Sequence, residues 1–388
     1  MRIINKAARY VVGIHKYLAF RTNFQENENR SHLTPIEHMK TVALIALITS
    51  MLFACQQAPS DDKQSAEEKI DKQKEVNLYS ARKEELMAPL LKEFTSQTGI
   101  KVNILSGKAD ALLTRIQSEG VNSPADVLLT TDAGRLHRAK QAGLFSPLDS
   151  SILDTIPTNY RDPESQWFGL SLRARLILLT DASNPLQISR YEDLAKPSLK
   201  GQICIRSSSN IYNQSLVASL ISHSGNELTK RWASDLVKNM ARAPQGGDTD
   251  QIRAAAAGQC SIAIANSYYL ARLLGADKNT DDYKAASKIT VVWPNQDDRG
   301  AHLNVSGAGV LKHAPNPQSA QKLIEFLVSD TAQQIYADVN YEYPIKAKIP
   351  LNPILKSMGD FKAETLPLSV LGENNAEAVR IMDQAAWK

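Results

Sequence analysis

The feature that most constrains this sequence is a regular alternation of strand-like and helix-like segments, which begins at Val76. Apolar strand-like runs are each followed by an amphipathic run with apolar residues three and four positions apart; the first three such strands are VNLYS, IKVNILSG and PADVLLTT. This alternation predicts a parallel sheet covered by helices. Ligands bind sheets of this kind beyond the carboxyl ends of the strands, so we expect a binding site there.

A long strand-like run at 167–180 opens a second block, and another at 302–313 is typical of a strand that returns to the first. Because the chain passes between the two blocks twice, we predict two lobes joined by a hinge. The predicted fold is α/β with two lobes, each a mixed, mainly parallel sheet flanked by helices, joined by hinge strands. The predicted bounds are 76–170 plus 291–345 for the N-terminal lobe and 171–290 plus 346–388 for the C-terminal lobe.

The N-terminal region carries export signals rather than a fold. Residues 1–38 lack sustained periodicity, and we interpret them as an upstream extension, with translation starting at Met39. A basic start and the apolar run TVALIALITSMLF predict a signal peptide over 39–54. The sequence LFAC resembles a lipobox, which makes Cys55 the lipidated residue; an ordinary signal or an uncleaved anchor helix is the alternative. Residues 55–75 are polar and lack aromatic side chains, which predicts a flexible tether.

Charge excludes one class of partner. Residues 1–54 hold seven Lys or Arg and three Asp or Glu, so their removal takes the formal net charge from +4 to about zero. A nearly neutral chain without a long basic run lacks the cluster of positive charge that nucleic-acid-binding proteins carry. We therefore expect no nucleic-acid partner, and contact with a membrane through the lipid anchor alone.

Two cysteines remain after Cys55, in the similar segments GQICIR and GQCSIA. Disulfides persist in exported proteins, and neighbouring strands would bring Cys204 and Cys260 together. We predict a disulfide between them; two buried free thiols are the alternative.

Three tyrosines follow strand-like runs of the second lobe: Tyr212, Tyr268 and Tyr269. For a single tyrosine, packing with a hydrogen-bonded hydroxyl is the ordinary role. Three phenol oxygens that converge on one cleft suit a small, hard cation. A trivalent metal displaces the phenol proton, and oxygen donors of this type favour Fe³⁺ over softer ions.

The sequence from Val76 onward resembles the periplasmic ferric-ion-binding proteins that serve iron ABC transporters, particularly the cyanobacterial iron-uptake subgroup. The segments that carry the resemblance are NLYSAR (77–82), PADVLLTTDAGRL (124–136), WFGLSLRARLI (167–177), RSSSNIYNQSLVAS (206–219), APQGGDTDQI (243–252), ANSYYLARL (265–273) and NYEYPI (340–345). The resemblance implies a class II periplasmic-binding fold whose cleft closes over Fe³⁺. It also implies that Tyr212, Tyr268 and Tyr269 are the iron ligands.

The resemblance also exposes a departure. Members of the subgroup place a histidine and a further tyrosine after the first strand, where this chain has Lys83 and Glu84. Protonated lysine is a poor ligand for Fe³⁺, although Glu84 could supply an oxygen. Water or a synergistic anion such as carbonate would then fill the remaining coordination positions.

Such an anion needs hydrogen-bond donors; the resemblance places Arg173 as one, and Arg82 lies near the tip of the first strand. Arg173 is the first candidate and Arg82 the second, because a planar guanidinium holds carbonate through paired hydrogen bonds. Arg175 is a weaker competitor, and a surface salt bridge is the alternative role for Arg173. Ser209 and Asn266 are further polar candidates near the tyrosines.

These observations predict a monomeric, lipid-anchored periplasmic protein that delivers Fe³⁺ to the permease and ATPase of an ABC transporter. One alternative keeps the fold and changes the ligand to a polyamine, thiamine or an oxyanion. The other is an exported hydrolase that uses a histidine. Motifs of the GxSxG, HExxH and P-loop types are absent from the sequence, so we expect no enzyme.

Overall fold

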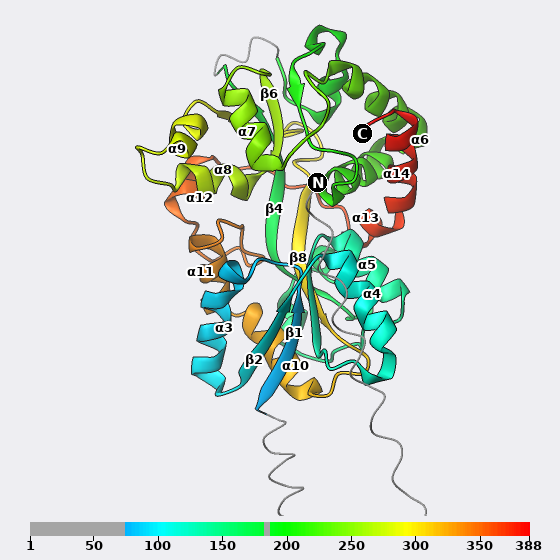
Figure 1. The fold of residues 1–388 in the computed structure, drawn as a ribbon, viewed down its shortest axis with the longest axis vertical. Helices are drawn as coiled ribbons and strands as arrows, with labels where there is room; N and C mark the ends of the chain where they lie inside the picture. Colours follow the sequence, from blue (N-terminus) through cyan, green and yellow to red (C-terminus); the bar gives the residue numbers. More distant parts are fainter. Residues whose placement is uncertain (1–73, 182–186) are drawn as a thin grey trace, which may run out of the picture. The chain divides into compact units, whose positions relative to one another are not determined.

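The computed structural model describes residues 74–181 and 187–388. Its first lobe is built on a sheet of four strands in the order β2–β1–β3–β8, in which β1, β2 and β3 are parallel and β8 is antiparallel to β3 (Figure 1). The strands are β1 (Glu75–Ser80), β2 (Lys101–Ser106), β3 (Val127–Thr131) and β8 (Leu303–Val310). The predicted strand–helix alternation is confirmed in this lobe.

A long strand, β4 (Phe168–Leu179), belongs to both lobes. Its first half, up to Ala174, pairs with β8, and its second half, from Arg175, pairs with the strands of the second lobe (Figure 1). Those strands are β5 (Ile203–Cys204), β6 (Ile262–Asn266) and β7 (Thr290–Val292). Only β5 and β6 are parallel there, because β6 and β7 both run antiparallel to β4. The predicted two-lobed mixed fold is confirmed, and the crossing strand β4 makes the second sheet more antiparallel than expected.

Helices cover both sheets through apolar faces of the predicted spacing. In α3, Met87, Leu90 and Phe94 are buried, and Gly99 ends the helix in the left-handed conformation that glycine adopts without strain. The other first-lobe helices are α4 (Ala109–Glu119), α5 (Ala133–Gln141), α10 (Pro317–Leu327) and α11 (Asp330–Asp338), and α3 spans Glu84–Thr98. The second block contains α6 (Ile211–Asn239), α7 (Asp248–Ala256), α8 (Ser267–Leu274), α9 (Asp281–Ala286), α12 (Pro353–Ser357), α13 (Ser369–Glu373) and α14 (Asn375–Gln384).

The segment α6 consists of two helices that meet at a kink. Gly225 has φ 77° and ψ 167° inside this segment, so the helix is interrupted there. The predicted N-terminal-lobe segment 291–345 starts inside β7. In the structure, β7 pairs with Ile177–Leu179 of the second sheet. The chain therefore returns to the first sheet between β7 and β8.

Asp132 joins the two lobes on one side of the cleft. It caps α5 by accepting from the backbone N–H of Gly134 at 2.8 Å. The hydroxyl of Ser215, on α6 of the second lobe, donates a hydrogen bond to the same buried carboxylate; its Oγ lies 2.8 Å from Oδ2 of Asp132. The first turn of α6 is thus in contact with the first lobe.

The predicted disulfide is confirmed: Cys204 on β5 is bonded to Cys260, which lies just before β6. It cross-links the strand that precedes α6 to the strand that precedes α8. The predicted extension, the signal peptide and Cys55 lie outside the described residues, as do all but the last two positions of the predicted tether. Among the described residues, no helix combines the length and apolar character needed to cross a membrane.

Candidate metal centre

A cavity of about 410 Å³ lies where the two lobes meet, and all three predicted tyrosines line it. Its other lining residues come from both lobes and are mostly basic or polar: Ala81, Arg82, Lys83, Leu86, Thr131, Arg173, Thr249, Arg253, Arg272, Leu273, Asp282 and Glu342. Tyrosines from two helices and arginines from four segments therefore share one water-accessible space.

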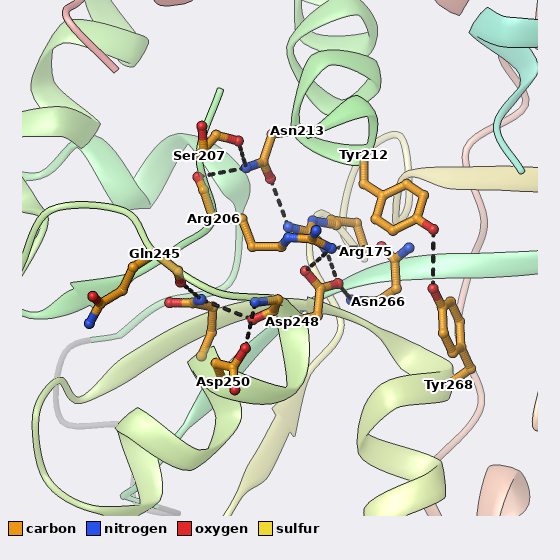
Figure 2. Close-up of polar contacts among 12 residues, drawn as sticks. Arg175, Arg206, Ser207, Tyr212, Asn213, Gln245, Asp248, Asp250, Asn266 and Tyr268 are labelled. Atoms are coloured by element: carbon orange, nitrogen blue, oxygen red, sulfur yellow. Dashed lines mark hydrogen bonds and ion pairs between the residues drawn. The ribbon is translucent and has the colours of Figure 1, made fainter. Parts of the chain in front are cut away.

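Helix N-termini bring the tyrosines together. Tyr212 is the second residue of α6, and Tyr268 and Tyr269 are the second and third residues of α8, which begins directly after β6. The Tyr268 hydroxyl donates to the Tyr212 hydroxyl at 3.3 Å, and the two side chains point toward one another in Figure 2. The rings of Tyr268 and Tyr269 lie with their centroids 4.2 Å apart. The positive ends of two helix dipoles favour negative charge at these positions.

Burial favours the protonated form of the Tyr268 and Tyr269 phenols by raising the pKa of each. The pKa of Tyr268 is well above its usual value because of burial and because Tyr212 and Tyr269 are close. Burial, together with Tyr212 and Asp248, raises the pKa of Tyr269 to about 12. A trivalent cation supplies the charge that would stabilise the phenolates, as it does for other ligands that must lose a proton on binding.

Three guanidiniums surround the phenol rings. Arg272 lies 4.8 Å and Arg173 5.5 Å from the ring centroid of Tyr268, and Arg206 lies 5.8 Å from that of Tyr212. These positive charges compensate phenolate charge in a partly buried site. Arg173 and Arg272 also line the cavity, so their N–H groups would be available to an anion in it.

Two predicted anion donors are already held by a carboxylate that sequence reasoning did not identify. The Arg82 guanidinium donates to both carboxylate oxygens of Glu342 at 2.8 and 2.9 Å, and one nitrogen of Arg173 lies 3.7 Å from the same group. Ser306 accepts from both arginines. Burial would raise the pKa of Glu342, but the two guanidiniums outweigh it and hold that pKa at about 2. Arg82 is therefore neutralised by the protein itself.

The remaining predicted residues divide between cavity and surroundings. Lys83 is exposed and lines the first-lobe side of the cavity, whereas Glu84 is exposed at the start of α3 and is not among the lining residues. Ser209 is exposed and hydrogen-bonded to the Ser207 hydroxyl at 3.0 Å. Asn266 is buried behind the tyrosines and accepts from Arg175. Of the four predicted anion donors, Arg82 and Arg173 line the cavity.

The phenols are the metal-ligand candidates that the described chain offers at this place. Among residues 74–181 and 187–388, no group of three or more His, Cys, Asp or Glu side chains could hold a metal ion. Hard oxygen donors of the phenolate type match Fe³⁺ better than soft divalent ions.

Comparison with known proteins decides the family. The family model for bacterial extracellular solute-binding proteins matches residues 122–362, more than half of the chain.

The chain belongs to this family.

The iron uptake protein A1 of Synechocystis is 48% identical over 350 residues, which cover 90% of this chain and 96% of that protein. The major ferric iron-binding protein of a Neisseria meningitidis serogroup A strain is 26% identical over 360 residues, 90% of this chain and 100% of that one. A solved Trichodesmium protein in complex with iron and citrate ligands superposes with a TM-score of 0.78 and 50% identity, covering 81% of this chain and 100% of that chain.

Proposed function

We propose that this solute-binding protein captures Fe³⁺ in its interlobe cavity, with Tyr212, Tyr268 and Tyr269 as phenolate ligands, and delivers it to an ABC transporter. The observation that carries the proposal is the convergence of the three phenols on one cavity, with Tyr268 hydrogen-bonded to Tyr212. The iron-related names of the similar proteins support the same cargo. The transporter's permease and ATPase are the expected partners, and a lipid anchor at Cys55 would keep the exported monomer at the membrane.

An anion is proposed to complete the coordination shell. Three phenolates leave positions free on an octahedral metal, and the first-lobe side of the cavity offers Lys83 and Arg82 rather than the histidine and tyrosine implied by the resemblance. Arg173 is the donor nearest to the phenol rings. Carbonate fits this role, and the iron and citrate ligands of the Trichodesmium structure make citrate a second candidate. The basic lining of the cavity disfavours a polyamine.

The absorption spectrum of the purified protein tests the metal ligands. Phenolate bound to Fe³⁺ produces a charge-transfer band in the visible range. We expect an orange to red colour after addition of ferric citrate with bicarbonate, and no colour for the Tyr268→Phe/Tyr269→Phe variant. Tyr283→Phe is the matched control, because Tyr283 lies on α9 and is not among the cavity-lining residues. A colourless wild-type protein in the presence of soluble, available iron would rule out phenolate coordination.

The anion is tested separately. Iron is supplied in carbonate-free buffer, and bicarbonate or citrate is then added to parallel samples. A band that changes position or intensity with bicarbonate alone indicates carbonate at the metal, and one that responds to citrate alone indicates citrate. An unchanged band in both samples means that water completes the shell.

A further inference from the structure

A buried guanidinium behind the tyrosines lies outside the cavity that they line. Arg175, on β4, is 1% exposed and is not one of the cavity-lining residues. One of its nitrogens donates to the Asp248 carboxylate at 2.6 Å and to the side-chain oxygen of Asn266 at 3.1 Å. The other donates to the side-chain oxygen of Asn213 at 2.7 Å (Figure 2). One side chain thus contacts three different segments.

Two of those segments carry or adjoin a tyrosine. Asn213 is the residue after Tyr212, and its amide also donates to the carbonyl oxygen of Arg206 at 2.9 Å, which fixes the loop before α6. Asn266 directly precedes α8, whose first turn contains Tyr268 and Tyr269. The first turns of α6 and α8 are therefore tied to the same guanidinium.

Asp248 is the third partner of Arg175 in this network. Its carboxylate accepts from the backbone N–H of Asn266 at 2.7 Å and from Arg206 at 3.4 Å, besides its ion pair with Arg175. Both members of the pair are buried, with side-chain exposures of 1% and 0%. Buried charges are tolerated only where the geometry is good and the surrounding polar groups are largely paired. Both terminal nitrogens of Arg175 donate hydrogen bonds, whereas its Nε and the amide nitrogen of Asn266 have no hydrogen-bond partner within the described residues. The planar fork of arginine is what reaches two asparagines and a carboxylate at once, which lysine cannot do.

We propose that Arg175 and Asp248 are positioning residues that set the spacing of the three phenol oxygens through Asn213 and Asn266. This inference rests on the proposed iron site. It assigns to Arg175 a role different from that of Arg173, two residues earlier on the same strand, which lines the cavity itself. Partners that orient metal ligands from behind typically change metal affinity about 10- to 100-fold when they are removed.

The test compares three variants of the full-length exported protein: Arg175→Lys, Asn213→Ala and Glu364→Gln. Arg175→Lys keeps the positive charge and removes the planar guanidinium. Asn213→Ala removes only the hydrogen bond between Arg175 and α6. Glu364→Gln is the matched control, because Glu364 is also a buried carboxylate that is hydrogen-bonded to side chains, those of His302 and His223, but does not line the cavity. Iron affinity is measured by competition with citrate, the charge-transfer band is recorded, and thermal unfolding reports stability.

The expected result is a loss of iron affinity of about 10- to 100-fold in Arg175→Lys, with a shifted or weakened band. Asn213→Ala should show a smaller loss in the same direction. Glu364→Gln should lower the unfolding temperature and leave the band and the affinity unchanged. Wild-type band and affinity in both Arg175→Lys and Asn213→Ala would overturn the inference, and so would an equal loss in the Glu364→Gln control at a similar unfolding temperature.

A crystal structure of iron-free Arg175→Lys separates this inference from the proposed function. The hydroxyls of Tyr212 and Tyr268, 3.3 Å apart here, are expected to move apart or lose their hydrogen bond in the variant. An unchanged separation overturns the positioning role whether or not the protein binds iron. A wild-type protein that fails to bind iron, with displaced hydroxyls in the variant, contradicts the proposed function and supports the positioning role.

Discussion

The two walls of the cavity differ in the chemistry that they offer. The second-lobe wall presents three phenols from the first turns of α6 and α8, backed by the Arg175–Asp248 ion pair. The first-lobe wall presents Lys83 and Arg82, and the nearby carboxylate of Glu342 neutralises Arg82. One wall offers phenol oxygens, which suit a cation, and the other offers a guanidinium that is already paired and an exposed ammonium.

Under the proposed function, coordination and closure are divided between the lobes. In this proposal a metal would bind first to the second-lobe phenols, because the segments that precede α6 and α8 are cross-linked by the disulfide between Cys204 and Cys260. The first lobe then closes over the metal and its remaining ligands, as solute-binding proteins do by hinge motion. The first-lobe wall would complete the charge balance without supplying a metal ligand.

The largest expected effect is on the second-lobe wall. Tyr212→Phe removes a phenolate ligand and should lower iron affinity by more than the roughly 100-fold upper range of outer-shell substitutions. The affinity is measured by competition with citrate, with the band intensity as a second readout. Retention of wild-type affinity would mean that Tyr212 only packs against Tyr268, and that the wall offers two ligands.

Glu342→Gln changes the charge balance of the first-lobe wall and should alter the pH dependence of stability. The folded-state pKa of Glu342, about 2, lies below its ordinary value of 4.5. Its stabilising contribution of about 3 kcal/mol is therefore fully present above roughly pH 4.5 and is lost as the pH falls toward 2.

We expect the variant to be less stable than wild type near pH 7, because two buried guanidiniums lose their partner, and the gap to close in acid. Denaturant unfolding over a series of pH values checks this. Glu84→Gln, a change at an exposed carboxylate, should leave the wild-type profile intact. Parallel profiles for wild type and Glu342→Gln would show that the Arg82 ion pair does not set the acid stability.

Ser215→Ala removes a hydrogen bond between the two lobes. The hydroxyl of Ser215 donates to the buried carboxylate of Asp132, and hydrogen bonds to charged groups contribute about 1.5–3 kcal/mol. We expect a loss of unfolding free energy in this range and a weaker iron affinity, since α6 carries both Ser215 and Tyr212.

Ser219→Ala is the matched control for this change. Ser219 lies one turn further along α6, is also buried and donates to Glu364 at 2.7 Å. It should cost similar stability in denaturant unfolding and leave the affinity unchanged. Equal iron affinities for Ser215→Ala and wild type would show that this contact between the lobes does not affect metal binding.

The smallest effect is expected for Lys83→Ala on the first-lobe wall. Lys83 is exposed, and exposed charges typically contribute less than about 1 kcal/mol, which corresponds to about a fivefold change in affinity. Citrate competition measures the change, with Lys356→Ala on α12 as a control outside the cavity lining. A loss as large as that of Tyr212→Phe would show that the first lobe contributes directly to the bound complex.

Local sequence patterns were sufficient for a large part of this protein. The strand–helix alternation from Val76 predicted the first lobe, because apolar periodicity is a property of consecutive residues. The same reasoning placed Tyr212, Tyr268 and Tyr269 at helix starts after strands, and the structure brings all three to one cavity. The disulfide between Cys204 and Cys260 was also predicted, since both cysteines lie in similar strand segments.

Contacts between distant segments were decided by the tertiary structure. Glu342 is 260 residues from Arg82 in the sequence, and Asp248 is 73 residues from Arg175, so no local pattern indicates either ion pair. Arg173 and Arg175 are equivalent by strand alternation, yet one lines the cavity and the other ties two helices together behind it. The sequence determined which side chains are available at each strand end; packing of the two sheets around β4 decided which of them meet, because burial leaves each charged group only the partners that the fold brings within reach.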